Sequence, residues 1–189
     1  RQSYGASATS DVKLETISGI ITAQVKGNTV KIKMTQPHSF RDEVHIKIEN
    51  TEYTGSFINT GVPHTVFFTE DIEKIDLLNI GRKVRYDKQF QPEGTNVNFV
   101  QVLSNDSISM RTYERGVENE TYACGTGAVA SSVIGYLKGL LKAKKITVFT
   151  KGGELSVELA STNRRQAGLN GEIKDVYLES PVEIIYSVE

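Results

Sequence analysis

The one cysteine of the chain, Cys124, stands directly before an apolar stretch that has the spacing of a helix. Unpaired N–H groups at the start of a helix stabilise anions, so we expect the pKa of this thiol to lie below its ordinary value of about 8.5. The position suits a catalytic cysteine that acts as a general base or a nucleophile. The apolar positions of the stretch are Val129, Ala130, Val133, Ile134, Leu137, Leu140 and Leu141.

The turn after Cys124 has room for a ligand beside the backbone, because Gly125 and Gly127 flank Thr126. A substrate carboxylate can then accept hydrogen bonds from the Gly125 and Thr126 amides. A buried structural cysteine is the alternative, and it is the commoner role of a lone cysteine. The polar setting between Tyr122 and the Gly-Thr-Gly turn favours the catalytic role.

The expected helix carries features of a central element. Spacing of this kind gives a helix a broad buried face, and Gly135 and Gly139 on its other side permit other backbone to approach closely. We therefore expect a helix wrapped by sheet. Three lysines, Lys142, Lys144 and Lys145, are expected at its C-terminal end, where the helix dipole favours cations.

Five motifs occur in a fixed order along residues 11–189, which is nearly the whole chain. Together they resemble the diaminopimelate epimerase family, whereas the Cys-Gly-Thr-Gly run alone would be a weak signal. The motifs are NTGVPH at residues 59–64, GTNVNFV at 94–100, ERG with ET and ACGTGA between 114 and 128, TKGGEL at 150–155, and VYL with PVE between 176 and 183.

The resemblance implies a pyridoxal-phosphate-independent amino-acid epimerase, an isomerase that interconverts LL- and meso-diaminopimelate for lysine and peptidoglycan precursor synthesis. It implies acid/base catalysis by two cysteines without a cofactor, with Cys124 as one of the pair. It places the reacting carboxylate of the substrate on the amides of Gly125 and Thr126. It assigns the distal amino-acid end of the substrate to Asn96, Glu114 and Arg115.

Two departures from the family qualify this expectation. No Cys-Gly-Asn-Gly motif precedes Asp11, so we expect the chain as given to be catalytically incomplete and to need a missing N-terminal lobe. Val62 stands where the family commonly has an asparagine, and a valine offers no polar group to the distal end of the substrate. His64 beside it lines the site or is a structural histidine held by backbone groups.

Composition excludes several other classes of function. The net charge of -1 and the absence of a basic cluster interleaved with aromatic residues argue against nucleic acid as a partner. No apolar run is long enough to cross a bilayer. One cysteine excludes an internal disulfide framework and fits the cytoplasm. The three histidines show no metal-ligand spacing, so no metal site is expected.

The pattern of elements predicts an α+β fold, a curved and mostly antiparallel sheet wrapped around the central helix, as in a diaminopimelate epimerase lobe. We expect residues 1–38 to be the remnant of an N-terminal lobe, 39–181 the C-terminal lobe with the Cys124 helix, and 182–189 a strand that returns to the first lobe. Residues 11–24 alternate loosely, and two strands joined at Gly27-Asn28 follow. Further strands are expected at 43–49, on both sides of a break at 61–64, at 96–102, 108–114 and 173–178, with a last strand at 182–188. The other expected elements are a short helix at 70–78, a hairpin of 146–150 with 155–159, and a surface loop at 161–171.

Two other functions stay open. The chain is a non-catalytic ligand-binding or assembly module that keeps the anion site of the fold, or it is a related amino-acid racemase. Proline racemases and the phenazine-pathway isomerase share the architecture, and Cys124 favours an epimerase over the second of these. A homodimer is also left open as the assembly.

Overall fold

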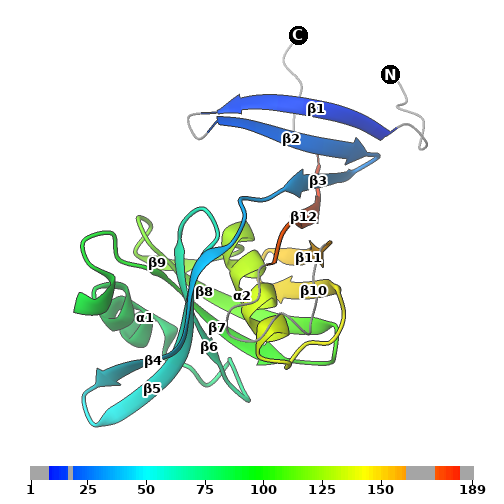
Figure 1. The fold of residues 1–189 in the computed structure, drawn as a ribbon. Helices are drawn as coiled ribbons and strands as arrows, with labels where there is room; N and C mark the ends of the chain where they lie inside the picture. Colours follow the sequence, from blue (N-terminus) through cyan, green and yellow to red (C-terminus); the bar gives the residue numbers. More distant parts are fainter. Residues whose placement is uncertain (1–8, 17–18, 161–172, 184–189) are drawn as a thin grey trace.

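The structure is a computed structural model that describes residues 9–16, 19–160 and 173–183. Twelve strands in these residues form one sheet, and the sheet curls around the helix α2 (Figure 1). The strands are β1 (Thr9–Thr16), β2 (Gly19–Lys26), β3 (Thr29–Lys33), β4 (His38–Ile48), β5 (Thr51–Asn59), β6 (Pro63–Phe68), β7 (Asn96–Val102), β8 (Ser107–Glu114), β9 (Asn119–Thr121), β10 (Lys145–Thr150), β11 (Gly153–Leu159) and β12 (Val176–Pro181). The helices are α1 (Leu77–Arg85), α2 (Gly125–Leu137) and the short 3-10 helix η1 (Lys88–Phe90).

The strand order is β1-β2-β3-β12-β11-β10-β8-β7-β6-β5-β4, with β9 paired to β8 off this path. Two neighbouring pairs are parallel, β6 with β7 and β8 with β10, and the other pairs are antiparallel. The predicted fold class, a mostly antiparallel sheet around a central helix, is therefore confirmed.

Helix α2 is enclosed on all sides, because it packs against β5 to β8 and also against β10 to β12. All ten residues from Gly127 to Tyr136 are buried, so the helix has no solvent face of the usual amphipathic kind. Gly135 permits a close approach by the Leu141 side chain, since a Cβ at this glycine would lie 2.8 Å from it. The main hydrophobic core forms between α2 and the sheet; it includes Ile58, Val66, Val100, Ile108, Met110, Ile134, Ile146, Val148, Val157 and Val176.

Helix α2 ends before the three lysines that were expected at its C-terminal end. It stops at Leu137, and Gly139 adopts a left-handed φ of 74° that turns the chain. Leu141 then folds back, and its amide donates to the Gly135 carbonyl at 3.0 Å. Lys142, Lys144 and Lys145 lie beyond this turn, so their predicted place at the helix end is wrong.

The helix predicted at residues 70–78 is also wrong, because α1 begins at Leu77. Asp76 is its N-cap and accepts a hydrogen bond from the Asn79 amide at 3.3 Å. Ile72 instead packs from a loop into a second hydrophobic cluster beneath α1. Gly81 lies inside α1, where a Cβ would meet Tyr113 at 2.6 Å.

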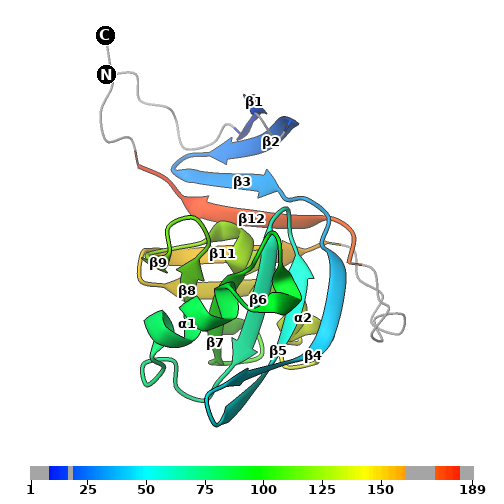
Figure 2. The same ribbon diagram turned by 90° about the vertical axis from the view of Figure 1, so that its left-hand side faces the viewer.

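The first three strands form an antiparallel extension of the sheet (Figures 1 and 2). The loosely alternating residues 11–24 belong to a hairpin of β1 and β2. The predicted Gly27-Asn28 turn joins β2 to β3, with Lys26 paired to Thr29. Strand β12 runs between β3 and β11 and connects this extension to the rest of the sheet, as Figure 2 shows.

Most of the other predicted strands are confirmed. The break at Gly61 separates β5 from β6, β7 begins at Asn96, and β10 pairs with β11 as the expected hairpin. The last described strand, β12, begins at Val176 and is displaced from the predicted range of 173–178. The loop predicted at 161–171 and nearly all of the strand predicted at 182–188 lie outside the described residues.

Candidate active site

Cys124 is the N-cap of α2, as its place in the sequence predicted. The thiol is 8% exposed, and its Sγ lies 3.5 Å from the Thr126 hydroxyl. Gly127 is required here, because a Cβ at that position would lie 2.5 Å from the Asn98 side chain and 3.2 Å from the sulfur. The sulfur is therefore packed under the first turn of the helix and faces its hydroxyl and amide groups.

The expectation of a lowered thiol pKa is wrong. Burial raises the pKa of Cys124 above its ordinary value, and the charge of Glu114 acts in the same direction. The Thr126 hydroxyl and the amides of Gly127 and Thr126 lower the pKa but do not outweigh the loss of water. In the resting state Cys124 is thus a protonated thiol, which has a proton to deliver.

His64 lies on β6 and is connected to Cys124 through Thr126. Its Nε2 lies 2.9 Å from the Thr126 hydroxyl, and its Nδ1 lies 3.0 Å from Nδ2 of Asn98. Burial lowers the pKa of His64 to about 3, and the Arg115 charge also lowers it, so the imidazole is neutral. His64 is fully buried and does not line the cavity beside Thr126. Of the two alternatives it is thus the structural histidine, but side chains rather than backbone groups hold its ring.

The sequence-predicted binding residues Asn96, Glu114 and Arg115 come together at adjacent ends of β7 and β8. Asn96 is 4% exposed; its Oδ1 accepts from the Arg115 amide at 2.8 Å, and its Nδ2 donates to the Pro63 carbonyl at 2.9 Å. The Arg115 guanidinium donates to the Glu93 carbonyl at 3.0 Å. Glu114 accepts from the Thr121 hydroxyl at 2.8 Å. Asn96 thus holds together the two loops on which Val62 and Arg115 lie.

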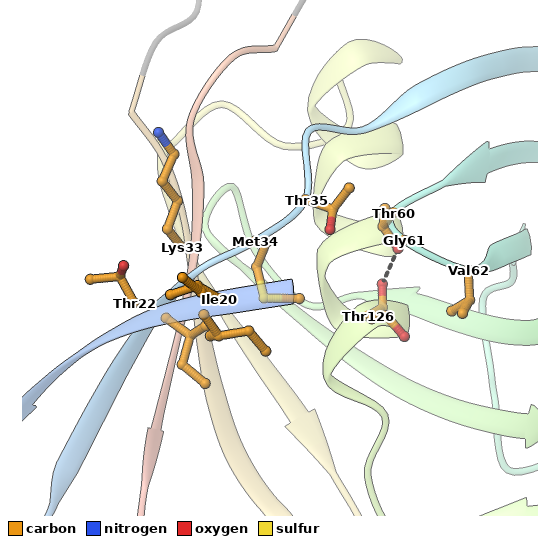
Figure 3. Close-up of a pocket in the computed structure, with 11 residues that line it drawn as sticks. Ile20, Thr22, Lys33, Met34, Thr35, Thr60, Gly61, Val62 and Thr126 are labelled. Atoms are coloured by element: carbon orange, nitrogen blue, oxygen red, sulfur yellow. Dashed lines mark hydrogen bonds between the residues drawn. The ribbon is translucent and has the colours of Figure 1, made fainter. Parts of the chain in front are cut away.

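A cavity of about 520 Å³ opens beside Thr126 (Figure 3). Its walls come from β2 and β3 on one side and from residues 60–62 on the other, and they are mostly apolar. The Thr60 hydroxyl donates to the Thr126 carbonyl at 3.0 Å and closes the wall between the cavity and α2. Val62 lines this cavity and gives it no hydrogen-bonding group.

Sequence reasoning missed three residues that support the site. Asn98 and Thr112 are buried beneath the start of α2 and carry the hydrogen bonds of His64 onward to β8. Glu118 stabilises the loop after Arg115, because its carboxylate accepts hydrogen bonds from Arg85 and from the Gly116 amide. The signal for Asn98 was its place two residues after Asn96, since alternate residues of a strand share a face.

The described part of the chain contains no cluster of three or more His, Cys, Asp or Glu side chains that could hold a metal ion. Within the same residues, no helix has the length and apolar character needed to cross a membrane.

Comparison with known proteins gives consistent matches. Residues 56–174 match the family model described as diaminopimelate epimerase. The diaminopimelate epimerase of Aquifex aeolicus is 46% identical over 168 residues, which cover 88% of this chain and 60% of that protein. That of a Hydrogenobaculum species is 44% identical over 151 residues, which cover 78% and 54%. The chain thus spans a little more than half the length of the curated relatives it matches.

Two solved structures share the fold at low sequence identity. A hydroxyproline epimerase from Agrobacterium vitis matches with a TM-score of 0.74 and 15% identity, over 95% of this chain and 59% of that one. A phenazine biosynthesis protein from Bacillus anthracis matches with a TM-score of 0.62 and 12% identity, over 94% and 68%.

Proposed function

Because the chain belongs to the diaminopimelate epimerase family, we propose that it supplies one of two catalytic cysteines in the interconversion of LL- and meso-diaminopimelate. The observation that carries the proposal is the buried Cys124 thiol at the start of α2, in a chain 46% identical to a protein named for that reaction. Lysine and peptidoglycan precursor synthesis in the cytoplasm is the corresponding role. The enzyme would work on a small amino acid without a cofactor.

The chemistry requires a base on one face of the α-carbon and an acid on the other. With its pKa raised by burial, Cys124 holds the proton that it delivers to one face. In the reverse direction its thiolate removes that proton. The charge that develops on the substrate spreads into the reacting carboxylate, which the Gly125 and Thr126 amides stabilise at the positive end of α2.

Arg115 and Glu114 bind the distal end of the substrate in this proposal. The planar guanidinium of Arg115 matches a carboxylate with two parallel hydrogen bonds, and the Glu114 carboxylate suits an ammonium group. Asn96 donates to the same distal carboxylate after releasing the Pro63 carbonyl, while its bond to the Arg115 amide supports the loop. Val62 lines the pocket, whereas His64 is fully buried behind Thr126.

We also propose a division of the chain into lobes. Residues 39–181 form the C-terminal lobe with the Cys124 helix. Residues 1–38 and 182–189 belong with an N-terminal lobe, which carries the second cysteine and is the partner that completes the site. The packing of α2 against β5 to β8 and β10 to β12 supports this division, because β1 to β3 form an extension that the pairing of β3 with β12 joins to those strands.

The test follows both deuterium and configuration. The purified chain is incubated with each pure diaminopimelate stereoisomer in heavy water, alone and with the N-terminal lobe of the Aquifex aeolicus relative. Alone it is expected to exchange the α-hydrogen of one stereoisomer slowly and with retention, because Cys124 serves only one face. Inversion is expected with the added lobe, and Cys124→Ala should abolish both reactions. Inversion by the chain alone would contradict the two-cysteine proposal.

A second candidate is a non-catalytic ligand-binding or assembly module, which the presence of one cysteine in 189 residues favours. Such a module binds diaminopimelate without any exchange of its α-hydrogen that depends on Cys124. The heavy-water experiment, combined with calorimetric binding, separates the two candidates.

A further inference from the structure

The segment that leads to Cys124 lies on the surface of the molecule. Strand β9 ends at Thr121 after three residues, and α2 begins at Gly125. Tyr122, between these two elements, is exposed. The helix fixes Cys124 from its carbonyl side, because the Ala128 amide donates to that carbonyl at 2.9 Å. On the amide side, the place of Cys124 depends on what holds the segment before it.

Glu120 is the charged residue of β9, and two cations hold its carboxylate. Nε of Arg111 donates to Oε1 at 2.8 Å and Nη2 donates to Oε2 at 3.1 Å, which is the bidentate geometry that a guanidinium and a carboxylate favour. Lys151, in the turn between β10 and β11, donates to Oε2 at 2.8 Å. The Arg111 hydrogen bonds hold the pKa of Glu120 below its ordinary value, so the carboxylate is charged at neutral pH.

The side chain of Arg111 is itself fixed in place. Its Nη1 donates to the Ile72 carbonyl at 2.8 Å, and the side chains of Arg111 and Glu120 are only 13% and 16% exposed. A mostly buried, bidentate pair with further hydrogen bonds keeps one geometry, whereas an exposed ion pair does not. Glu120 therefore fixes β9 to the neighbouring strand β8.

The turn between β10 and β11 also holds the residue after β9. The Gly152 amide donates to the Tyr122 carbonyl at 2.7 Å. A Cβ at Gly152 would lie 3.1 Å from that carbonyl oxygen, so any other residue would displace Tyr122 by a few tenths of an ångström. Gly153 beside it is required for another reason, its left-handed φ of 123°. Lys151 and Gly152 thus attach the same turn to both ends of the stretch 120–122.

We propose that Glu120 is a positioning residue that fixes Cys124 through residues 121–123. The turn between β10 and β11 completes this support through Lys151 and Gly152. None of these three residues lines the cavity beside Thr126, so they act on the chemistry through the place of the sulfur and not through binding of the substrate. The effect on epimerisation rests on the proposed function, whereas the effect on the place of the sulfur does not.

The first measurement is the rate at which iodoacetamide alkylates Cys124 at pH 8 in the purified chain, without any substrate. Glu120→Gln removes the charge that both cations bind, and Lys151→Met removes one of the two cations. Both changes should raise the rate about threefold to tenfold, because the sulfur is buried and becomes accessible when the segment before it loosens. Lys151→Arg keeps the cation and should have the wild-type rate. Lys151 is half-exposed, so the Lys151→Met protein keeps its fold even if the Glu120→Gln protein does not.

Lys138→Met is the matched control, because Lys138 binds the Asp42 carboxylate at 2.6 Å at the opposite end of α2. The side chains of Asp42 and Glu120 are buried to a similar degree, with 21% and 16% exposed. The control should lower the urea midpoint at least as much as Lys151→Met and leave the alkylation rate of Cys124 unchanged. An equal rise of the rate in Lys138→Met would mean that a general loss of stability exposes the sulfur, which would overturn the proposal. Wild-type rates in both Glu120→Gln and Lys151→Met would overturn it as well.

The second measurement is the steady-state kinetics of the chain supplemented with the N-terminal lobe of the Aquifex aeolicus relative. Glu120→Gln and Lys151→Met should lower kcat about threefold to tenfold with little change in KM, because a small displacement of a reacting group slows the chemical step. Gly152→Ala displaces Tyr122 and should lower kcat by a similar factor. A loss confined to KM would contradict a positioning role. If the supplemented wild-type chain shows no activity, the proposed function fails, while the alkylation rates still decide whether Glu120 positions Cys124.

Discussion

Nε of Arg85, near the end of α1, lies 3.1 Å from Oε1 of Glu118 in the loop after Arg115. Glu118 also accepts from the Gly116 amide at 3.0 Å and from the Tyr113 hydroxyl at 3.3 Å. Arg85 packs against Gly94 as well, where a Cβ would collide with its guanidinium. One arginine thus supports both loops that carry the candidate binding residues.

Glu118→Gly should lower the free energy of unfolding by about 1 kcal/mol. Glu118 has a φ of 58°, so glycine relieves backbone strain, but the loss of several charge-assisted hydrogen bonds exceeds this gain. The measurement is the free energy of unfolding in urea. The matched control is Glu49→Gly, because Glu49 has a φ of 57° and a single exposed ion pair with Lys83, and this change should be neutral or stabilising. Equal effects of the two changes would show that the Glu118 carboxylate contributes nothing.

His64 should make the folded protein less stable in weak acid. The folded state keeps the ring neutral down to a pKa of about 3, whereas the unfolded chain takes up a proton below about pH 6.5. The unfolded state binds more protons in this window. The contribution of the neutral His64 to the free energy of unfolding is therefore fully present above pH 6.5 and is lost as the pH decreases towards 3. Urea unfolding between pH 6.5 and 5 should show a slope approaching about 1.4 kcal/mol per pH unit.

Two variants are controls for the dependence of the free energy of unfolding on pH. His64→Gln cannot titrate and should remove most of the slope. His45→Gln, at an exposed position, should have the same slope as wild type. The range stops at pH 5 because the pKa values of Glu118 and Glu120 are lowered, so these carboxylates affect stability only at lower pH. A wild-type slope equal to that of His64→Gln would rule out the buried neutral histidine.

Arg115→Lys should lower kcat/KM for diaminopimelate about tenfold to hundredfold in the completed enzyme. A lysine keeps the charge but loses the two parallel hydrogen bonds to a carboxylate. Steady-state kinetics should place most of the loss in KM, because the distal end of the substrate does not react. Arg82→Lys, on the exposed side of α1, should match wild type, and unchanged kinetics for Arg115→Lys would remove Arg115 from the site.

Val62→Asn should sharpen the preference for diaminopimelate over shorter amino acids about tenfold. Val62 lines the cavity without a polar group, whereas an amide there can bind the distal ammonium or carboxylate. The measurement is the ratio of kcat/KM values for the two kinds of substrate. Val62→Thr adds a polar group that is too short to reach as far, and it should change the ratio less. A wild-type ratio that already equals that of Val62→Asn would contradict this prediction.

The sequence predicted those parts of the fold that depend on local patterns. The Gly27-Asn28 turn, the hairpin of β10 with β11, and α2 after Cys124 each have their signal within a few residues. The start of α1 was misplaced because several acidic residues before it compete as caps, and Asp76 is the one that caps the helix.

The chemistry of the site was less predictable than its place. The raised pKa of Cys124 results from burial by strands distant in sequence, and no local pattern reports such burial. Asn98 and His64 meet because β6 and β7 are parallel neighbours in register. The motifs identified the residues at the site, but the pairing of strands decides which atoms face one another.

The enclosure of α2 also determines when its backbone meets water. Ten consecutive residues of the helix are buried between two sets of strands, so no partial opening at the surface can expose their amides. Hydrogen exchange in α2 must await the opening of the sheet, and its rate then measures the free energy of global unfolding. The helical residues that follow Cys124, from Ala128 to Tyr136, would therefore be among the last parts of the molecule to exchange.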